Sequence, residues 1–470
     1  EEDLKEYNAQ NSNPGGATST KSYYANNKSK ETKPSLPSLG ISVGTSNARV
    51  SFLNIKNNNN NPFIVENREG SRRTPSFVQL DYNDPIHTSN YSWGQMAKSK
   101  QYQQQNQVMT SRPVLDFLSQ NYYNDNKHDK TEDERLLVAQ HALQILVKEL
   151  ASSALQKIIG DLPTTKPNQQ KQILFGELYY NVQPVITYPP ALDFNNKSSN
   201  SKSLFINGLK PFSQTSNHIK YVSEPLAAVV AADHFQLLPA DSGNSNNIKE
   251  QPVLVLDIGG DGLNVSLIQN QQVLYHSYTP GIGVDTLITA IVNLCKRDFF
   301  STKKQNVDGM ALQLLNNAAE DTLWELSSHP ARQHRSIISI PYLSMDYQTK
   351  QPLHFSMGVT SHLVEEEATQ IILTNIMREK NQDYNTISDA ISSILTDTLI
   401  KTKLTPFQLC GILLVGDGAR SPIYQSSIKK GLARIAGENF VATKLIIPPN
   451  EQAEELTVLG AALIGESNYV

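Results

Sequence analysis

Two stretches far apart in the chain share one pattern of hydrophobic and polar residues. Residues 40–55 and 253–268 each run as an apolar strand into glycines and leave them as an alternating strand. This pattern predicts two antiparallel strand pairs, each with a tight glycine turn. One such turn is common in hairpins. Two of them favour two related lobes that offer backbone N–H groups to one phosphate ligand held between them.

The apolar spacing also predicts helices and further strands. Residues 132–159 have helical spacing over several turns, and residues 182–190 form a buried strand that ends in prolines. We expect a helix to open at Glu224, with proline in its first turn, and another to start at Val284. The other predicted elements are a strand at 273–278, a strand, glycine turn and helix over 409–432, and an apolar helix from 457.

Polar segments interrupt this pattern. Residues 1–38 are rich in Asn, Ser, Lys and Gly, so they cannot bury enough apolar surface to offset the entropy of ordering. We therefore predict a disordered tail there. Similar patches favour inserted surface loops; they are 57–61, 103–107, 195–203 and 241–247.

Composition excludes several classes of function. The 470 residues include 41 Lys and Arg against 45 Asp and Glu, so there is no basic excess for direct nucleic-acid binding. No apolar run is long enough to span a bilayer or to act as a signal peptide, so we expect no membrane association. Cys295 and Cys410 lie in apolar surroundings and are predicted to be buried structural thiols.

Four motifs follow one another along the chain: GISVGTSNARV (40–50), VSEPLAAVVAA (222–232), LDIGGDGLNVSLI (256–268) and LVGDGARSPI (414–423). Their order resembles that of the first phosphate loop, connecting segment, second phosphate loop and adenosine loop in the ATPase domain of the 70-kilodalton heat-shock (DnaK-type) chaperones. VITYPPALDF and the C-terminal IIPPNE and LGAALIGES also resemble family segments, so the likeness spans residues 40–466.

The resemblance implies an α/β fold: a two-lobed actin-like ATPase (ribonuclease H-like) fold with a nucleotide cleft between the lobes. The implied ligands are ATP or ADP with Mg²⁺. We expect the disordered tail to be followed by lobe I over 39–250 and lobe II over 251–447. Residues 448–470 are expected to form a closing loop and a helix that returns to lobe I.

The resemblance also assigns nucleotide-binding residues. They are Gly44, Thr45, Ser46, Gly259, Gly260, Gly262, Asp285, Glu320, Trp324, Gly416, Gly418 and Arg420. Arg420 is the candidate for stacking on the base. Trp324 is either a second stacking residue or part of the core. Asp285 matches an acid of the lobe-closing segment, but we favour a role as N-cap of its helix.

Three residues match catalytic positions of the family. Glu224 and Asp257 are candidates for holding Mg²⁺ through its water shell. Their alternatives are a charge at a helix N-terminus for Glu224 and a turn-capping acid for Asp257. Arg112 falls where the family has a catalytic lysine. It either grips a terminal phosphate or is a surface arginine, because its guanidinium lacks the geometry of an ammonium.

Other positions depart from the family's pattern. Ser42 and Asn264 replace acids, and Gly262 replaces a threonine. Because two anionic groups are lost, we expect hydrolysis to suffer more than binding. Asp261 and Asp417 stand where the family has glycines, and a carboxylate about 4 Å from a phosphate would cost about 4 kcal/mol. Pointed outward, either acid would cost little.

The first hypothesis is a cytoplasmic, DnaK-like regulator that binds ATP and hydrolyses it weakly or not at all. The lost acids, and a sequence that ends just after the closing helix, favour a branch like the ribosome-associated Ssz-type members. By resemblance, its partners would be a J-domain co-chaperone, another heat-shock chaperone or the ribosome. The alternatives are an active ATP-hydrolysing chaperone and an interaction scaffold that binds no nucleotide.

Overall fold

The protein is represented by a computed structural model with a mixed α/β architecture. The structure describes residues 36–54, 61–81, 83–86, 90–100, 108–118, 132–161, 181–194, 199–210, 219–239, 251–307, 309–329, 334–380, 384–449 and 451–466. The predicted tail therefore lies almost wholly outside the described residues, as do most of the polar patches.

Two sheets repeat one strand arrangement. The first has the order β3-β2-β1-β8-β9 and the second the order β12-β11-β10-β15-β16. In both, antiparallel strands are continued by two later strands that run parallel to the first. The strands are β1 (Ser38–Val43), β2 (Asn47–Leu53), β3 (Phe63–Ile64), β8 (Gln183–Tyr188), β9 (Lys220–Ser223), β10 (Val253–Ile258), β11 (Gly262–Gln269), β12 (Gln272–Pro280), β15 (Gly411–Val415) and β16 (Leu445–Ile446). Both predicted strand–turn–strand units are thus confirmed.

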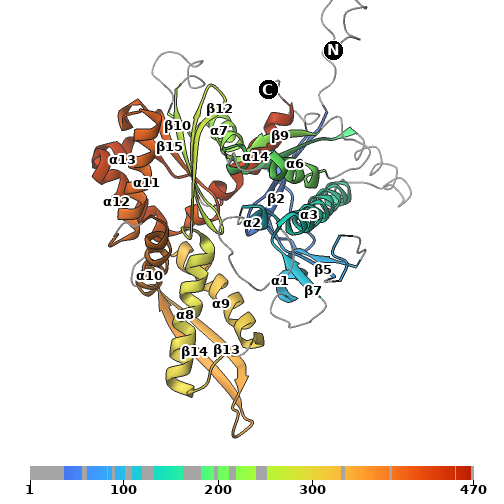
Figure 1. Ribbon diagram of the computed structural model, residues 1–470, viewed down its shortest axis with the longest axis vertical. Coiled ribbons are helices and arrows are strands. Elements are labelled where there is room, and N and C mark those ends of the chain that lie inside the picture. The colour runs from blue at the N-terminus through green and yellow to red at the C-terminus, as the bar shows by residue number, and fades with distance from the viewer. Residues whose placement is uncertain are drawn as a thin grey trace, which may run out of the picture. The chain divides into compact units, whose positions relative to one another are not determined.

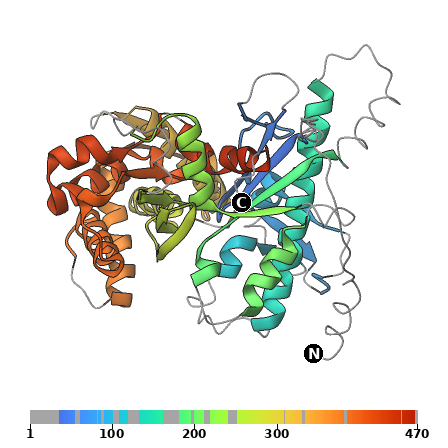
Figure 2. The same cartoon turned by 90° about the horizontal axis from the view of Figure 1, so that it is seen from above.

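Side chains of β1 alternate between two packing layers, as the period of a strand requires. Leu39 and Ile41 belong to an apolar core shared with the long helix α3 (Glu132–Asp161). On the other side, Gly40 meets the backbone of α14 (Gln452–Glu466). Helix α14 also packs along α7 (Glu224–His234), and the red and green helices lie side by side in Figure 2.

The second sheet shares a core with the helices that follow it. Leu256 and Val265 from the sheet and Ile291 from α8 belong to one buried cluster. Helices α8 and α9 also pack against the β13–β14 hairpin (Figure 1). These later elements are α8 (Val284–Lys303), α9 (Gly309–Ser328), β13 (Arg335–Met345), β14 (Pro352–Thr360), α10 (Ser361–Lys380), α11 (Ile387–Thr402), α12 (Pro422–Ala436) and α13 (Glu438–Lys444).

Smaller elements complete the described structure. Strand β4 pairs with β2, and β6-β5-β7 form a short sheet of their own. The elements are β4 (Thr74–Pro75), β5 (Val78–Asp81), β6 (Ser92–Trp93), β7 (Val108–Ser111), α1 (Gly94–Lys100), α2 (Pro113–Leu118), α5 (Ala191–Phe194), α6 (Ser199–Gly208) and the 3₁₀ turns η4 (Pro406–Gln408) and η5 (Asp417–Arg420).

Most local predictions hold. Helix α7 opens at Glu224 with proline in its first turn, α8 opens at Val284, and both cysteines are buried and free. The loop predicted over 195–203 is wrong from Ser199, where α6 begins, because Phe205 of this polar helix is buried in the core beside α3. Among the described helices, none is long and apolar enough to cross a membrane.

The contact between α14 and α7 depends on a glycine. A Cβ on Gly460 would lie 1.8 Å from the carbonyl oxygen of Ala227, so α14 would have to move. We expect Gly460→Ala to lower the free energy of unfolding by about 1–3 kcal/mol, the usual cost of overpacking. Chemical denaturation measures this change.

The matched control is Gly160→Ala, at a helical glycine of α3 with nothing within 4 Å of an added Cβ. It should stabilise the protein by about 0.5–1 kcal/mol, because alanine favours helix. Equal stability of the two variants would contradict the packing argument.

Candidate functional site

The glycine loops of the two sheets meet at one pocket. The turn after β1, the turn between β10 and β11 and the turn after β15 all contribute to its wall, together with the start of α14. Of the residues predicted from the sequence, those that line it are Gly44, Thr45, Ser46, Glu224, Asp257, Gly259, Gly260, Gly262 and Gly416. The structure therefore brings these nine predicted residues to one pocket, from segments more than 350 residues apart.

Close backbone approach holds these loops in place. A Cβ on Gly260 would lie 1.7 Å from Ser46 Oγ, and one on Gly283 would lie 2.3 Å from the carbonyl oxygen of Gly260. The backbone N–H of Asp285 donates to that same carbonyl at 2.8 Å. The N–H of Asp261 donates to Thr45 Oγ1 at 3.3 Å. Glycine at 260 is thus required by contact between the loops, independently of any ligand.

Arg112 and Asp285 join the first glycine loop to the start of α8. The guanidinium of Arg112 donates to Thr45 O at 3.0 Å and to Ser46 Oγ at 2.8 Å, and it pairs with Asp285 Oδ2 at 2.6 Å. Burial opposes its charge, yet Asp285 raises the pKa of Arg112 above its usual value. The pair adjoins the pocket through Thr45 and Ser46, two of the pocket's lining residues.

The N-cap prediction for Asp285 is wrong. The N-cap of α8 is Gly283, in extended conformation, and Asp285 lies in the first helical turn. Its carboxylate instead accepts from Ser46 Oγ at 2.9 Å and from Arg112. A carboxylate in the first turn remains favourable with the helix dipole, so the helix start is preserved without a side-chain cap.

Glu224 and Asp257 are two acids in one wall of the pocket. Glu224 is 8% exposed, at the first turn of α7, and Asp257 lies on β10. Burial, and then the Asp257 carboxylate, raise the pKa of Glu224 well above its usual value. Burial and the charge of Asp417 raise the pKa of Asp257 to about 7, although Arg49 lowers it. The two acids therefore resist being charged together at neutral pH.

Arg49 is a site residue that sequence reasoning missed. It lies on β2, is 8% exposed and lines the pocket. Its guanidinium pairs with Asp417 Oδ1 at 2.7 Å and with Glu454 Oε2 at 2.5 Å. Burial opposes ionisation of Asp417, but Arg49 lowers the pKa of that acid below its usual value. The sequence signal that could have identified Arg49 is a charged residue among the apolar positions of a predicted buried strand.

The two acids at glycine positions are therefore both partnered. Asp417 is 7% exposed, pairs with Arg49 and accepts from Asn47 Nδ2 at 2.7 Å. Asp261 accepts a hydrogen bond from the Tyr278 hydroxyl of β12. Asp417 lines the pocket rather than pointing outward, but its charge is balanced locally.

The residues predicted to meet a base contact one another. The guanidinium carbon of Arg420 lies 5.2 Å from the Trp324 ring centroid, and that of Arg73 lies 4.4 Å from it. Trp324 also packs against the core of the second sheet. Glu320 pairs with Lys98. None of Arg420, Trp324 and Glu320 is among the lining residues of the pocket.

Two further observations concern the other predicted residues. A Cβ on Gly418 would lie 2.2 Å from the Ile258 side chain, so packing alone requires this glycine.

Asn264 lines the pocket, and its Oδ1 is buried without a hydrogen-bond partner among the described residues. Such an orphan acceptor is costly unless a donor reaches it.

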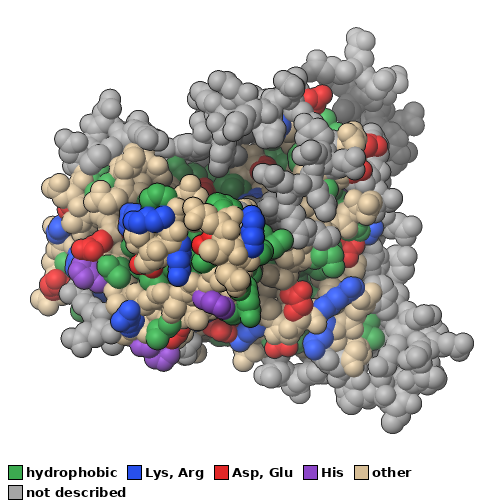
Figure 3. Space-filling view, turned by 90° about the horizontal axis from the view of Figure 1, so that it is seen from below, with side chains coloured by type: hydrophobic (Ala, Val, Ile, Leu, Met, Phe, Trp, Pro, Cys, Tyr) green, Lys and Arg blue, Asp and Glu red, His purple; other side chains and the backbone are tan. Residues whose placement is uncertain are grey.

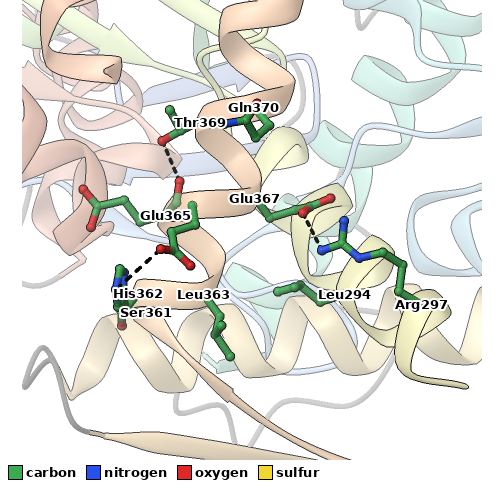
Figure 4. Close-up of a pocket in the computed structure, with 10 residues that line it drawn as sticks. Leu294, Arg297, Ser361, His362, Leu363, Glu365, Glu367, Thr369 and Gln370 are labelled. Atoms are coloured by element: carbon green, nitrogen blue, oxygen red, sulfur yellow. Dashed lines mark hydrogen bonds and ion pairs between the residues drawn. The ribbon is translucent and has the colours of Figure 1, made fainter. Parts of the chain in front are cut away.

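A second hollow lies between α8 and α10. Figure 4 shows its side chains, with Arg297 of α8 paired to Glu367 of α10 and His362 facing the helix's own acids. These are surface ion pairs of small energetic value. Among the described residues, no group of three or more His, Cys, Asp or Glu side chains is placed to hold a metal ion. This hollow therefore gives no sign of a metal centre.

The raised pKa of Asp257 predicts how stability depends on pH. The folded protein holds this proton more tightly than the unfolded chain, so stability falls as pH rises from about 4 to about 7, by up to ~1.4 kcal/mol per unit. Asp257→Asn should flatten this part of the profile and raise Tm at pH 8. Thermal unfolding between pH 4 and 8 measures both effects. An unchanged profile would contradict a raised pKa. Asp233→Asn, at a half-buried position of α7, is the control.

Comparison with known proteins gives one consistent relationship. Chaperone protein DnaK of Ureaplasma urealyticum is 25% identical over 437 residues, which cover 91% of this chain and 58% of the relative. Chaperone protein DnaK of Thermus thermophilus is 24% identical over 444 residues, which cover 90% of this chain and 60% of the relative. No protein-family model matches the chain.

The chain spans about three-fifths of the length of these relatives. These relatives confirm the resemblance to the 70-kilodalton heat-shock (DnaK-type) chaperones that the four motifs indicate.

Proposed function

We propose that the chain is a two-lobed, actin-like nucleotide-binding domain that binds ATP or ADP at the glycine loops and hydrolyses ATP weakly or not at all. The observation that carries the proposal is the meeting of three glycine turns, from two sheets of the same topology, at one pocket. In such a fold the two sheets would belong to two lobes and the pocket to the cleft between them. Backbone N–H groups of such turns suit phosphate oxygens.

Weak hydrolysis follows from the charges of the pocket. Ser42 and Asn264 line it where the family has acids, and neither can carry negative charge. Phosphoryl transfer depends on placed charges and a positioned water. Binding depends more on the glycine loops, which keep their close contacts. The chain thus keeps the glycine loops expected to bind a nucleotide, and it lacks two of the acids expected to support hydrolysis.

The family also implies Mg²⁺, for which Glu224 and Asp257 are the candidate outer ligands. The donor set fits this ion poorly. Mg²⁺ prefers anionic oxygens, whereas Ser42 and Asn264 offer neutral ones. The pocket also holds the Arg49 guanidinium, a cation in the same wall. We therefore assign no step of the function to the metal.

Arg420, Trp324 and Glu320 are proposed to bind the base side, and Arg112 with Asp285 the phosphate side. The proposal keeps the domain boundaries expected from the sequence. Lobe I covers 39–250, lobe II covers 251–447 and the closing segment covers 448–470. Arg112 supports this assignment because it holds the phosphate loop directly through Thr45 and Ser46.

The proposed role is that of a cytoplasmic regulator of protein folding. Its partners would be a J-domain co-chaperone and another heat-shock chaperone or the ribosome, in the manner of the Ssz-type branch. The alternatives are an active chaperone ATPase and a scaffold without nucleotide. Direct nucleic-acid binding is not proposed, because the sequence has 41 Lys and Arg against 45 Asp and Glu, and acidic and basic side chains are interspersed on the face shown in Figure 3.

Calorimetric titration with ATP and ADP, beside a turnover assay, tests the proposal. We expect saturable binding with ATP hydrolysis at least about a hundredfold slower than that of Thermus thermophilus DnaK, since loss of one charge-stabilising group costs about 10²–10³ in rate. The DnaK protein in the same buffer is the positive control. Turnover at the rate of the DnaK control would support the active ATPase. Absence of binding by both nucleotides would support the interaction scaffold.

A further inference from the structure

Arg73 is an unpaired arginine beside the residues proposed to bind the base. Its guanidinium carbon lies 4.4 Å from the Trp324 ring centroid, and that of Arg420 lies 5.2 Å from the same centroid. Arg420 pairs with Glu454 at 3.0 Å. Among the residues that the structure describes, no carboxylate pairs with Arg73, and its buried Nη1 has no hydrogen-bond partner. Asp321 of α9 interacts with it electrostatically but does not pair with it.

Trp324 adds a second unpaired donor at the same place. Its indole Nε1 is buried and has no hydrogen-bond partner among the described residues. A buried donor left without an acceptor is costly, so native structures rarely keep one unless a ligand or water completes it. Two such donors, on side chains that lie against each other, indicate a ligand that supplies acceptor atoms.

The acids around this stack are engaged by other cations. Glu320 of α9 pairs with Lys98. Asp417 feels the charge of Arg73 but pairs with Arg49 at 2.7 Å. The groups that are left unpaired at the indole ring are therefore donors, and a ligand here must present acceptors to them.

The two purine bases differ in what they present to a guanidinium. Guanine carries two adjacent acceptors, N7 and O6, which match the paired donors of an arginine. Adenine carries N7 beside its N6 amino group, which is itself a donor and would face an arginine donor. Stacking on an indole suits the ring of either base. A free guanidinium beside the stacking surface therefore separates two bases that stacking alone does not.

We propose that Arg73 determines the base specificity of the site and favours guanine nucleotides over adenine nucleotides. This inference rests on the proposed nucleotide binding and names the preferred base, with ATP and ADP as ligands of lower affinity. The base would stack on Trp324 and accept hydrogen bonds from Arg73 at N7 and O6. This position adjoins the pocket of the glycine turns, because Arg420 ends the η5 turn whose first residue, Asp417, lines that pocket.

Titration of the full chain with GTP and with ATP, in the same buffer with excess Mg²⁺, tests the inference. We expect GTP to bind at least about fivefold more tightly, the lower limit for a bidentate contact between arginine and guanine. A smaller ratio, or tighter binding of ATP, would overturn the inference and leave the proposed function standing. Absence of binding by both nucleotides would overturn the proposed function and this inference with it.

Analogues of GTP identify the atoms of the base that are recognised. The 7-deaza analogue lacks the N7 acceptor and should bind more weakly than GTP by about fivefold, the loss of one hydrogen bond to a charged group. Inosine triphosphate keeps N7 and O6 but lacks the 2-amino group, so its Kd should match that of GTP. Equal affinity of the 7-deaza analogue and GTP, or inosine triphosphate as weak as ATP, would overturn recognition of this edge.

Variants of Arg73 separate recognition of the base from folding, because the readout is the ratio of the two Kd values. Arg73→Ala should remove the preference, so that GTP and ATP bind alike. Arg73→Gln should reverse it, because a glutamine amide pairs with N6 and N7 of adenine. Arg68→Ala is the matched control: this exposed arginine of the same segment contacts Gln156, and its loss should leave the ratio unchanged.

Circular dichroism and Tm establish that each variant is folded. Structural damage alone would weaken GTP and ATP equally and keep their ratio as it is in the unaltered chain. An unchanged ratio in folded Arg73→Ala would therefore overturn the role of Arg73 in specificity.

Discussion

The pocket depends on one buried arginine that pairs with two buried carboxylates. Arg49 comes from β2 of the first sheet, Asp417 follows β15 of the second, and Glu454 lies in the first turn of α14. Removing one partner of a buried ion pair typically costs about 3–5 kcal/mol, because the remaining charge stays in low dielectric. No member of this cluster can therefore be replaced alone. An acid in a glycine turn is tolerable here only because a buried strand carries an arginine.

The backbone of the site is positioned by close contacts of its glycines, whereas its charged side chains are positioned by ion pairs. Gly260 meets Ser46, and Gly283 meets Gly260, at distances that admit no Cβ. The Gly283 contact is with backbone atoms, so it constrains the turns independently of the charged side chains nearby. The charged groups can consequently change in kind while the turns keep their shape. A change of a charged residue in this pocket can therefore leave the geometry of its glycine turns intact.

The local sequence pattern predicted the helices and strands. It could not predict side-chain partners that depend on contacts between distant segments. The strand pairs and the starts of α7 and α8 follow from neighbouring residues, so the sequence was sufficient. Asp285 was misread because its partner, Arg112, is 173 residues away. Arg49 was missed for the same reason, since Asp417 is 368 residues away. Helix α6 was misread as a loop because packing of its Phe205 outweighs a polar composition.

The two ends of the site are linked through one acid. Glu454 Oε2 accepts from Arg49, while its Oε1 accepts from Arg420 at 3.0 Å. Arg420 in turn faces Trp324. A base that stacks on Arg420 would share that guanidinium with Glu454 and with the indole, and any shift of Glu454 would unbalance Arg49 and Asp417. In the proposed nucleotide site, recognition of the base and the electrostatics at the phosphates would therefore be coupled through Glu454 of α14.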